Sequence, residues 1–458
     1  MKTLIEPFKI KTVEEIPITT REQREKYLKD AFYNPFFLRS EHVTIDLLTD
    51  SGTTAMSSKQ WAGLMDGDEA YAGSRSYYKF ENIVKEITGF KNIIPTHQGR
   101  AAEKILFTLV AKPGITIPSN SHFDTTRGNI EYAGADAVDN LVDVGMQPEI
   151  EADFKGNMDV EKLRKLILER GPQNIPLCML TVTNNTAGGQ PVSMQNIRDT
   201  KSVLKEFGIP LILDACRFAE NAYFIKKREP GYQNKTIKEI AQEMFSYADG
   251  ATMSAKKDGL SNTGGFLALN NDELAEQAKV LLIITEGFLT YGGMTRRDLE
   301  ALAQGFVEVL EESYLELRIG QIQYLGNKLL EAGVPILQPT GGHAVYLDAK
   351  RFAPHIPPHH FPGQSVLCEL YLVSGVRSVE IGSLMFGKED AAGNPLAPPM
   401  ELVRMAIPRR VYTQAHTDYV AEACIETYQN RSKLRGMKIV HEAKYLRHFT
   451  IKLDYVGN

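Results

Sequence analysis

The sequence is poor in cysteine and carries no strong excess of charge of either sign. Its four cysteines lie far apart and form no C-x-x-C pair, which is typical of buried free thiols in a reducing compartment and excludes a disulfide framework. The net charge of −5 at pH 7 leaves no broad basic field for nucleic acid or an anionic membrane. No apolar run approaches the roughly 18 residues of a membrane span, and the first residues, which include Pro7, are charged. We therefore expect a cytoplasmic protein without nucleic-acid or membrane partners.

Three common catalytic signatures are also missing. The sequence contains no G-x-G-x-x-G after a strand, no G-x-x-x-x-G-K-[ST] and no G-x-S-x-G. Nicotinamide, P-loop and α/β-hydrolase functions therefore lose their main support.

What the sequence does contain is an alternation of short apolar strands and amphipathic helices. Strands are predicted at 92–96, 114–119, 175–183, 209–215, 250–255 and 265–270. Helical patterns lie between several of them, for example at 99–111, 160–171 and 197–208, and a capping box opens another at Thr236. Near-continuous apolar strands separated by helices predict an α/β domain with a mostly parallel sheet covered on both faces.

The second half of the chain changes character. Residues 296–333 repeat apolar positions at three- and four-residue steps and predict a long helical connection. Beyond it, 343–349, 376–382 and 402–408 predict strands of a smaller α+β unit, with a loop at 388–399. We predict a large cofactor-binding domain over 49–310, a small C-terminal domain over 311–458, and an N-terminal arm over 1–48 that also forms part of the small domain.

Two predicted strands end in ionisable side chains. Asp214 ends the apolar strand 209–215, where an ionised carboxylate is costly without a cationic partner. Lys256 and Lys257 follow Ser254 at the end of the strand 250–255, where loss of water lowers the pKa of a lysine and makes its amine nucleophilic. Each feature alone also fits a plainer interpretation, a structural strand-end acid and a solvated lysine pair.

A possible anion site completes the set. Gln98, Gly99 and Arg100 lie between a strand and a helix start, where backbone N–H groups point outward and a glycine lets a ligand approach. A buried carboxylate, a lysine and an anion cradle are together the parts that hold pyridoxal phosphate. We therefore predict a pyridoxal phosphate enzyme in which the acid holds the pyridinium nitrogen and the cradle, with Ser254, binds the phosphate.

Longer motifs resemble a known family. The tryptophanase and tyrosine phenol-lyase family of β-eliminating lyases has close counterparts of the segments IDLLTDSGTTAMS, GDEAYAGSRSYY, PTHQGR, AGGQPVSM, AENAYFIK, MSAKKD, EGFLTYGG, GGHAV and IPRRVYTQAHTDY. The resemblance runs from near residue 6 to near residue 455. It implies the aspartate aminotransferase-like fold, called fold type I, a homotetramer, and cleavage of the Cβ–Cγ bond of an aromatic amino acid to pyruvate, ammonia and the aromatic leaving group.

The resemblance assigns roles to individual residues of the cofactor site. Lys257 would be the Schiff-base lysine and the base for the α-proton, and Asp214 would hold the pyridine nitrogen. Phe123 would stack on the ring, and Asn185 and Arg217 would lie by its 3′-oxygen. The phosphate group would be bound by Lys256, Ser254, Gln98, Gly99 and Arg100.

The resemblance also implies the substrate contacts and a cation site. Arg404 would bind the substrate carboxylate bidentately, with Thr49 and Ser51 nearby. Tyr71 would be the general acid that protonates the ring carbon. A potassium or ammonium ion would be bound by Glu69 and by the backbone oxygens of Gly52 and Asn262.

Three positions favour an indole over a phenol leaving group. The phenol-releasing branch has threonine, arginine and phenylalanine where this sequence has Asp124, Ile381 and His448, and Phe449 adjoins the last of these. Arginine assists a phenolate oxygen that indole lacks, whereas isoleucine suits a large apolar ring. The resemblance therefore favours L-tryptophan as substrate. L-tyrosine cleavage is the alternative, and an aminotransferase or a non-catalytic binding protein on the same fold are the more distant ones.

Overall fold

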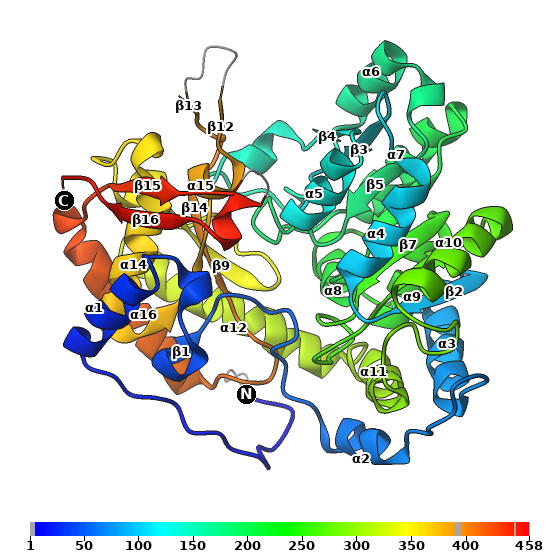
Figure 1. Ribbon diagram of the computed structural model, residues 1–458, viewed down its shortest axis with the longest axis horizontal. Coiled ribbons are helices and arrows are strands. Elements are labelled where there is room, and N and C mark those ends of the chain that lie inside the picture. The colour runs from blue at the N-terminus through cyan, green and yellow to red at the C-terminus, as the bar shows by residue number, and fades with distance from the viewer. Residues whose placement is uncertain (1–4, 390–394, 444–445, 458) are drawn as a thin grey trace. The chain divides into compact units, whose positions relative to one another are not determined.

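The computed structural model describes residues 5–389, 395–443 and 446–457 and divides into two compact units. Unit 1 comprises Met1–Asp50, Met146–Ala152 and Arg318–Asn458, and unit 2 comprises Ser51–Gly145 and Asp153–Leu317. Figure 1 shows both units with their elements labelled, and we describe each one by itself.

Unit 2 is built around a five-stranded sheet. Its strands, in spatial order, are β2 (Asn92–Thr96), β8 (Gly265–Leu269), β7 (Gly250–Ser254), β6 (Leu211–Asp214) and β5 (Cys178–Thr181). The pairs β7–β6 and β6–β5 are parallel, whereas β8 pairs antiparallel with both β2 and β7. A further parallel pair, β3 (Thr116–Ser119) and β4 (Asp136–Asp139), lies with β3 against β5. The predicted mostly parallel α/β architecture is confirmed, whereas the short β4, which is mostly exposed or half-buried, was not predicted.

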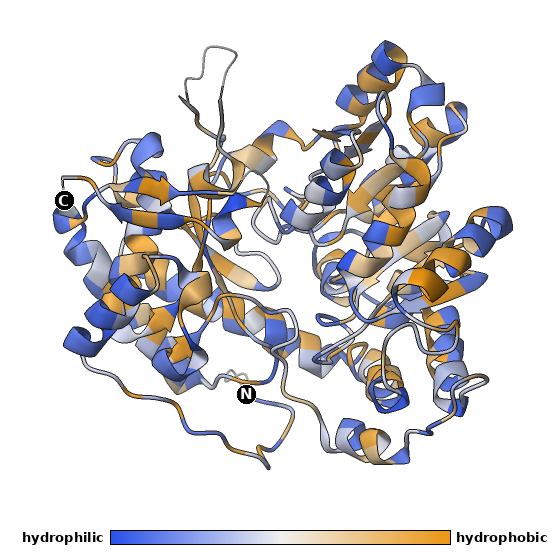
Figure 2. Cartoon of the chain, in the orientation of Figure 1, coloured by the Kyte–Doolittle hydropathy of each residue, from blue (hydrophilic) through white to orange (hydrophobic). Residues whose placement is uncertain are grey.

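Helices flank this sheet. In chain order they are α2 (Ser58–Asp66), α3 (Arg75–Thr88), α4 (Gly99–Val110), α5 (Asp124–Tyr132), α6 (Val160–Arg170), α7 (Met194–Glu206), α8 (Phe218–Arg228), α9 (Ile237–Ser246), α10 (Asp272–Thr285) and α11 (Arg296–Glu308). The predicted capping box opens α9, where Thr236 Oγ1 accepts a hydrogen bond from the Glu239 N–H at 3.2 Å. Figure 2 shows hydrophilic and hydrophobic residues alternating around α6, as expected for a helix with one face on a core.

The side-chain alternation of β8 explains why both faces of the sheet are covered. Leu267 and Leu269 belong to an apolar cluster with buried residues of α4 and α10. Phe266, the residue before Leu267, points to the other face, where its ring lies 6.1 Å from that of Phe80 in α3 and 6.0 Å from that of Phe306 in α11. A strand that is apolar at successive positions must bury both of its faces.

Unit 1 is the smaller α+β part. Its elements are α1 (Arg21–Asp30), β1 (Ile45–Asp46), β9 (Ala344–Asp348), α13 (Ala349–Phe352), α14 (Pro362–Ser374), β10 (Val376–Arg377), β11 (Val379–Ile381), α15 (Ser383–Phe386), β14 (Leu402–Ala406), α16 (Gln414–Gln429), β15 (Met437–His441) and β16 (Lys452–Tyr455). An antiparallel sheet of order β11-β14-β9 forms its centre, and the strands predicted from the sequence in this region are present.

Two local predictions need correction. The helical stretch 296–333 is not continuous, because α11 ends at Glu308 and α12 (Glu312–Glu331) begins after a three-residue break. The segment 388–399 is not only a loop, because β12 (Lys388–Glu389) and β13 (Pro395–Leu396) pair antiparallel, while 390–394 lie outside the described residues. Throughout the described ranges, none of the helices has the length and apolarity needed to cross a bilayer.

Candidate active site

The carboxyl ends of β6 and β7 bring the predicted acid and the predicted lysines to one edge of the sheet in unit 2. The two strands are parallel, with Asp214 opposite Thr252, so that Asp214 and the turn after Ser254 emerge at the same edge. The turn is tight: the Lys257 N–H donates to the Ser254 carbonyl at 3.4 Å, and the Leu260 N–H donates to the Lys257 carbonyl at 2.9 Å. Parallel strands place their C-terminal ends together, which is where ligands bind in such sheets.

A buried carboxylate fixes this lysine turn in place. Asp258 is fully buried, and its Oδ2 accepts hydrogen bonds from the N–H groups of Ala219 at 2.8 Å and Glu220 at 3.4 Å, at the start of α8. The negative charge also suits a helix N-terminus. The aspartate that follows the two lysines therefore orients them by binding the neighbouring helix.

The predicted anion cradle lies directly beside the end of β7. A Cβ atom on Gly99 would lie 2.5 Å from the Cβ and 2.7 Å from the Cα of Ser254, so only glycine fits where α4 begins. A Cβ on Gly265 would likewise meet the backbone carbon of Gln98 at 2.7 Å. Both glycines permit close backbone approach, and they bring the first N–H groups of α4 next to the serine hydroxyl.

The positive charges of Lys256, Lys257 and Arg100 repel one another at the start of α4. Lys256 Nζ donates to Gln98 Oε1 at 3.3 Å. Burial, together with the positive charges of Lys257 and Arg100, lowers the pKa of Lys256 to about 8. Cations brought this close repel one another unless an anion lies between them. The arrangement therefore fits a phosphate group.

The remaining predicted cofactor residues surround the same edge. The Val182 N–H donates to the Asp214 carbonyl at 3.0 Å, and the Arg217 N–H donates to the Val182 carbonyl at 3.2 Å, which places Arg217 beside the turn that carries the buried Asn185. Phe123 precedes the first residue of α5, the buried Asp124. Arg217 and Asn185 thus lie near the ends of β5 and β6, and Phe123 and Asp124 lie at the start of α5.

The sequence analysis missed one ionisable group here. Glu103, in the second turn of α4, is only 7% exposed, and its Oε1 accepts a hydrogen bond from Thr126 Oγ1 at 2.5 Å. Burial and the carboxylate of Asp214 raise the pKa of Glu103 to about 8, although Thr126 and Lys257 act to lower it. Its place directly after the cradle motif is the signal that could have drawn attention to it.

The residues predicted for a monovalent cation are only partly together. Asn262 Nδ2 donates to the carbonyl oxygens of Gly52 at 3.0 Å and Thr54 at 3.2 Å, so two of the three lie side by side. Glu69 is exposed and pairs with Arg297 at 2.9 Å.

Tyr71, the predicted general acid, lies on an exposed aromatic cluster. Its side chain is 66% exposed, and its ring stacks on Phe288 at 5.4 Å and meets Tyr291 edge-on at 5.6 Å. A hydrogen bond with Tyr291 raises the pKa of Tyr71.

Unit 1 carries the predicted substrate-carboxylate residue. Arg404 lies in the central strand β14, is 6% exposed, and donates from Nη2 to the Leu48 carbonyl at 3.1 Å. Thr49 follows Leu48 directly and belongs to the same unit, whereas Ser51 belongs to unit 2.

The three residues predicted for the ring pocket that lie in unit 1 form a connected group. Ile381 ends β11 and is buried, and α15 begins two residues later and contacts the short helix η7 (Arg447–Phe449). The ring of His448 lies 4.0 Å from that of Phe449, and Phe36 packs edge-on against both. The group is apolar and aromatic, with one imidazole.

Two buried glutamates that the sequence analysis passed over hold this group in position. Glu380 accepts hydrogen bonds from the N–H groups of Leu384 at 2.9 Å and Met385 at 3.2 Å, and Glu401 accepts from that of Ser383 at 3.1 Å. Burial and the negative charge of Glu401 together raise the pKa of Glu380 to about 8. The two carboxyl groups therefore cap α15, directly after Ile381.

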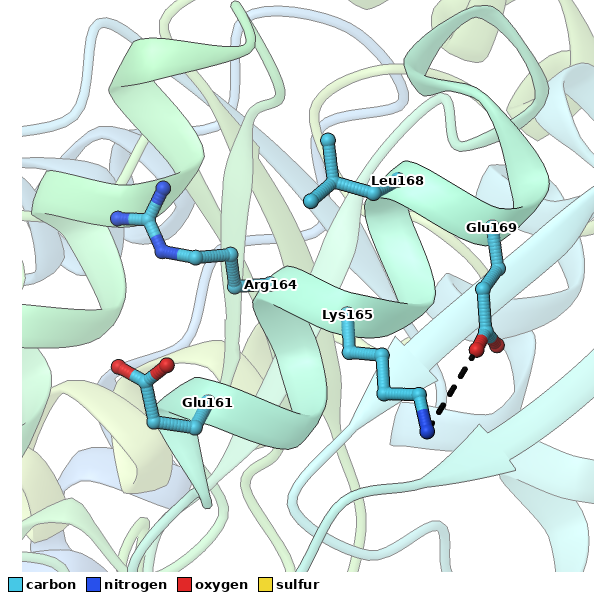
Figure 3. Close-up of a pocket in the computed structure, with 5 residues that line it drawn as sticks. All are labelled: Glu161, Arg164, Lys165, Leu168 and Glu169. Carbon is cyan, nitrogen blue, oxygen red and sulfur yellow. Dashed lines mark ion pairs between the residues drawn. The ribbon is translucent and has the colours of Figure 1, made fainter.

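A surface hollow elsewhere in unit 2 has no such chemistry. Figure 3 shows that its lining comes from α6 alone: Glu161, Arg164, Lys165, Leu168 and Glu169. Lys165 pairs with Glu169 at 3.7 Å, and Arg164 pairs with Glu206 at 2.7 Å. These are solvated ion pairs on a helix face.

Comparison with known proteins agrees with the geometry. Residues 46–423 match the beta-eliminating lyase family. The chain is 57% identical to a tryptophanase of Salinibacter ruber, over 99% of this chain and 96% of that protein. It is 54% identical to a tryptophanase of Hyphomonas neptunium, over 99% and 100% of the two chains. It is 52% identical to a tyrosine phenol-lyase of Pasteurella multocida, over 98% of each.

Solved structures of low sequence identity share the fold. A serine palmitoyltransferase of Sphingomonas wittichii matches with a TM-score of 0.58 at 14% identity, over 90% of this chain and 97% of that one. A second serine palmitoyltransferase, from S. paucimobilis with PLP bound, matches with a TM-score of 0.56 at 13% identity, over 85% and 88%. The predicted fold type I architecture is confirmed.

Proposed function

The chain belongs to the beta-eliminating lyase family, and from this premise we propose that it cleaves L-tryptophan to indole, pyruvate and ammonia. The observation that carries the proposal is the sheet edge of unit 2, where Asp214, the lysine turn and the Gly99 cradle meet. The full-length similarity to tryptophanases supports the choice of reaction.

The residues at this edge fit pyridoxal phosphate. The glycine cradle and the mutually repelling cations suit its phosphate, and the buried carboxylate of Asp214 suits a protonated ring nitrogen. When bound, the group supplies an electron sink for negative charge at the substrate α-carbon. Lys256, Ser254, Gln98, Gly99 and Arg100 would hold the phosphate group. Phe123, Asn185 and Arg217 would hold the ring.

The chain's own groups would perform the proton transfers and orient the substrate. Lys257 would hold the cofactor aldehyde and carry the α-proton. Arg404, with its planar guanidinium, would bind the substrate carboxylate, assisted by Thr49 and Ser51. Tyr71 would donate a proton to the ring carbon, and its raised pKa keeps the hydroxyl protonated at neutral pH.

The four residues that the family resemblance assigns to the substrate ring favour indole as the leaving group. Ile381, His448 and Phe449 present a mainly apolar surface with one imidazole, and Asp124 adds a carboxylate at the start of α5. None of these four is an arginine or a lysine, and a fixed cation is the group that would favour a phenolate. Tyrosine cleavage is the second candidate, because tyrosine phenol-lyases are similar over the same length.

We also propose a potassium or ammonium ion at Gly52, Asn262 and Glu69, a homotetramer, and a cytoplasmic location. The adjoining Gly52 and Asn262 supply oxygen atoms, which suit a hard cation. Exposed aromatic residues, among them Trp61 at 52% and Tyr71 at 66%, suit burial against further copies.

The decisive experiment supplies the purified holoenzyme with L-tryptophan or L-tyrosine and measures indole, phenol and pyruvate. We expect indole to form faster, whereas faster phenol release would overturn the assignment. The Lys257→Ala variant should form neither product. Asp124→Thr and His448→Phe should slow tryptophan cleavage by about ten-fold or more, yet slow a β-substituted substrate with a good leaving group far less. Equal losses on both substrates would mean that these residues do not serve the ring.

A further inference from the structure

The short helix η7, which carries His448 and Phe449, cannot hold its position by itself. It contains only three residues, and Leu446 directly before it has a φ of 49°, in the left-handed region that residues other than glycine rarely adopt. A single helical turn closes too few hydrogen bonds to be stable alone. The orientation of η7, and with it the placement of the His448 ring, therefore depends on neighbouring elements of unit 1.

Arg447 joins η7 to α15. Its Nε donates to the Leu384 carbonyl at 2.9 Å, its Nη2 donates to the Ser383 carbonyl at 2.9 Å, and its Nη1 pairs with Glu442 at 3.0 Å. The carbonyl groups at the end of a helix lack partners within it, and the planar fork of a guanidinium can bind several of them at once. The Arg447 side chain is 26% exposed, so it can be exchanged without emptying a core.

The helix α15 is a firm support for this contact, because its other end is fixed by the two buried glutamates. The Ser383 hydroxyl donates to Glu401, in addition to the backbone hydrogen bonds that both carboxyl groups accept. A Cβ atom on Gly382 would collide with Glu401 Oε2 and would lie 2.8 Å from Glu380 Oε1, so only glycine fits between Ile381 and α15. Ile381 is thus tied to α15, and α15 is tied through Arg447 to His448.

Asn34 fixes the backbone of η7 from the N-terminal segment of unit 1. It is fully buried, and its Nδ2 donates to the carbonyls of His448 at 3.2 Å and Ile451 at 2.8 Å. Its Oδ1 accepts from the N–H of Phe36, whose ring packs against those of His448 and Phe449. Asn34 therefore anchors η7 to the aromatic contact, and Arg447 anchors it to the element that carries Ile381.

We propose that Arg447 is a specificity-determining positioning residue, which holds η7 against α15 so that His448, Phe449 and Ile381 are kept in place for the aromatic leaving group. This inference rests on the proposed function, in which those three residues serve the substrate ring. Arg447 uses its donors on α15 and Glu442 and acts through its neighbours. Its effect is therefore confined to substrates whose leaving group extends to that group of residues.

The test compares kcat/KM for L-tryptophan and for S-ethyl-L-cysteine, whose thiolate leaving group is small and carries no ring. Arg447→Gln should lower kcat/KM for L-tryptophan by about ten-fold or more, because a misplaced contact costs rate, and that for S-ethyl-L-cysteine by no more than about two-fold. Arg447→Lys keeps the charge but not the fork and should show a smaller loss, also confined to L-tryptophan. Equal losses on the two substrates, or no loss on L-tryptophan, would overturn the proposal.

A matched control comes from another arginine of unit 1. Arg431 Nη1 donates to the Tyr428 carbonyl at 2.8 Å near the end of α16, so it also binds a helix carbonyl. Arg431→Gln should change kcat/KM for either substrate by less than about two-fold. A loss confined to L-tryptophan in this variant too would show that the selectivity does not come from η7, and the proposal would be wrong.

A double-mutant cycle shows whether Arg447 acts through η7. In a His448→Phe background, Arg447→Gln should lower kcat/KM for L-tryptophan by at most about three-fold, because the imidazole that it positions is already absent. The full loss in that background would show that Arg447 acts elsewhere. Wild type that releases phenol faster than indole would refute the proposed substrate, and the same variants compared on L-tyrosine would then decide the role of Arg447 separately.

Discussion

The lowered pKa of Lys256 makes phosphate binding sensitive to pH in a defined range. Burial, with Lys257 and Arg100 adding to it, brings this pKa from 10.5 to about 8 when no anion is bound. Below pH 8 the ammonium group is charged and attracts phosphate. Above pH 8 it is neutral. A bound phosphate dianion favours the charged form, so binding should raise the pKa of Lys256 again and take up a proton.

The size of the effect follows from this linkage. Above pH 8 and up to the pKa of the bound form, each pH unit should weaken phosphate binding by up to about ten-fold, because one proton must be taken up. Between pH 7 and pH 9 the protonated fraction falls by about ten-fold, and affinity should fall in proportion. Lys256 is partly buried and donates to Gln98 Oε1 at 3.3 Å, so the charge lies within the site.

The assay titrates apoenzyme with pyridoxal phosphate and, separately, with pyridoxal at pH 7, 8 and 9. Pyridoxal carries the same aldehyde without the phosphate group, so the ratio of the two dissociation constants cancels the pH dependence of Lys257. We expect the ratio to change about ten-fold in wild type and to stay flat in Lys256→Arg, which remains charged, and in Lys256→Met, which never is. A flat ratio in wild type would refute the reasoning, as would an equal change in the variants.

Three further substitutions test the close approach at Gly99 and the dependence of ion-pair strength on burial. Gly99→Ala should weaken pyridoxal phosphate binding by about ten-fold or more, because its methyl group would lie 2.5 Å from Ser254 Cβ and force the start of α4 away; calorimetry checks this, and unaltered affinity would contradict it. Asp50→Asn should lower the free energy of unfolding by about 3–5 kcal/mol, measured by denaturant titration, because it removes a buried negative charge that faces Arg409 at 2.8 Å and Arg318 at 3.6 Å. Arg164→Ala, which breaks an exposed pair, should lower the free energy of unfolding far less. Similar losses in Asp50→Asn and Arg164→Ala would show that burial does not determine how much an ion pair stabilises the fold.

Much of the secondary structure could be predicted from the sequence because the patterns that indicate strands and helices are local. Strand 250–255 is apolar at successive positions and was found as Gly250–Ser254, and the Thr236 capping box opens α9 as expected. The break between α11 and α12 was missed because the apolar period continues through it. The pairing of β12 with β13 was missed because each contains only two residues.

In the candidate site, too, local sequence signals could be recognised, but contacts between distant residues could not. The lysine pair, the strand-end aspartate and the glycine before Arg100 could be recognised from residue type and spacing, and the family motifs extended them to the substrate residues. The sequence could not show that Glu103 lies within electrostatic reach of Asp214, or that Glu380 and Glu401 together cap α15.

The sequence by itself therefore determined the kinds of element, their order, and the chemical groups at the sheet edge. Those depend on propensity, periodicity and motif, which act over a few residues. Only the tertiary structure decided which of those groups are buried together, that Lys256 loses its proton near pH 8 and that Gly99 must remain glycine. Burial and charge depend on neighbours that folding brings from distant parts of the chain, and no local pattern records them.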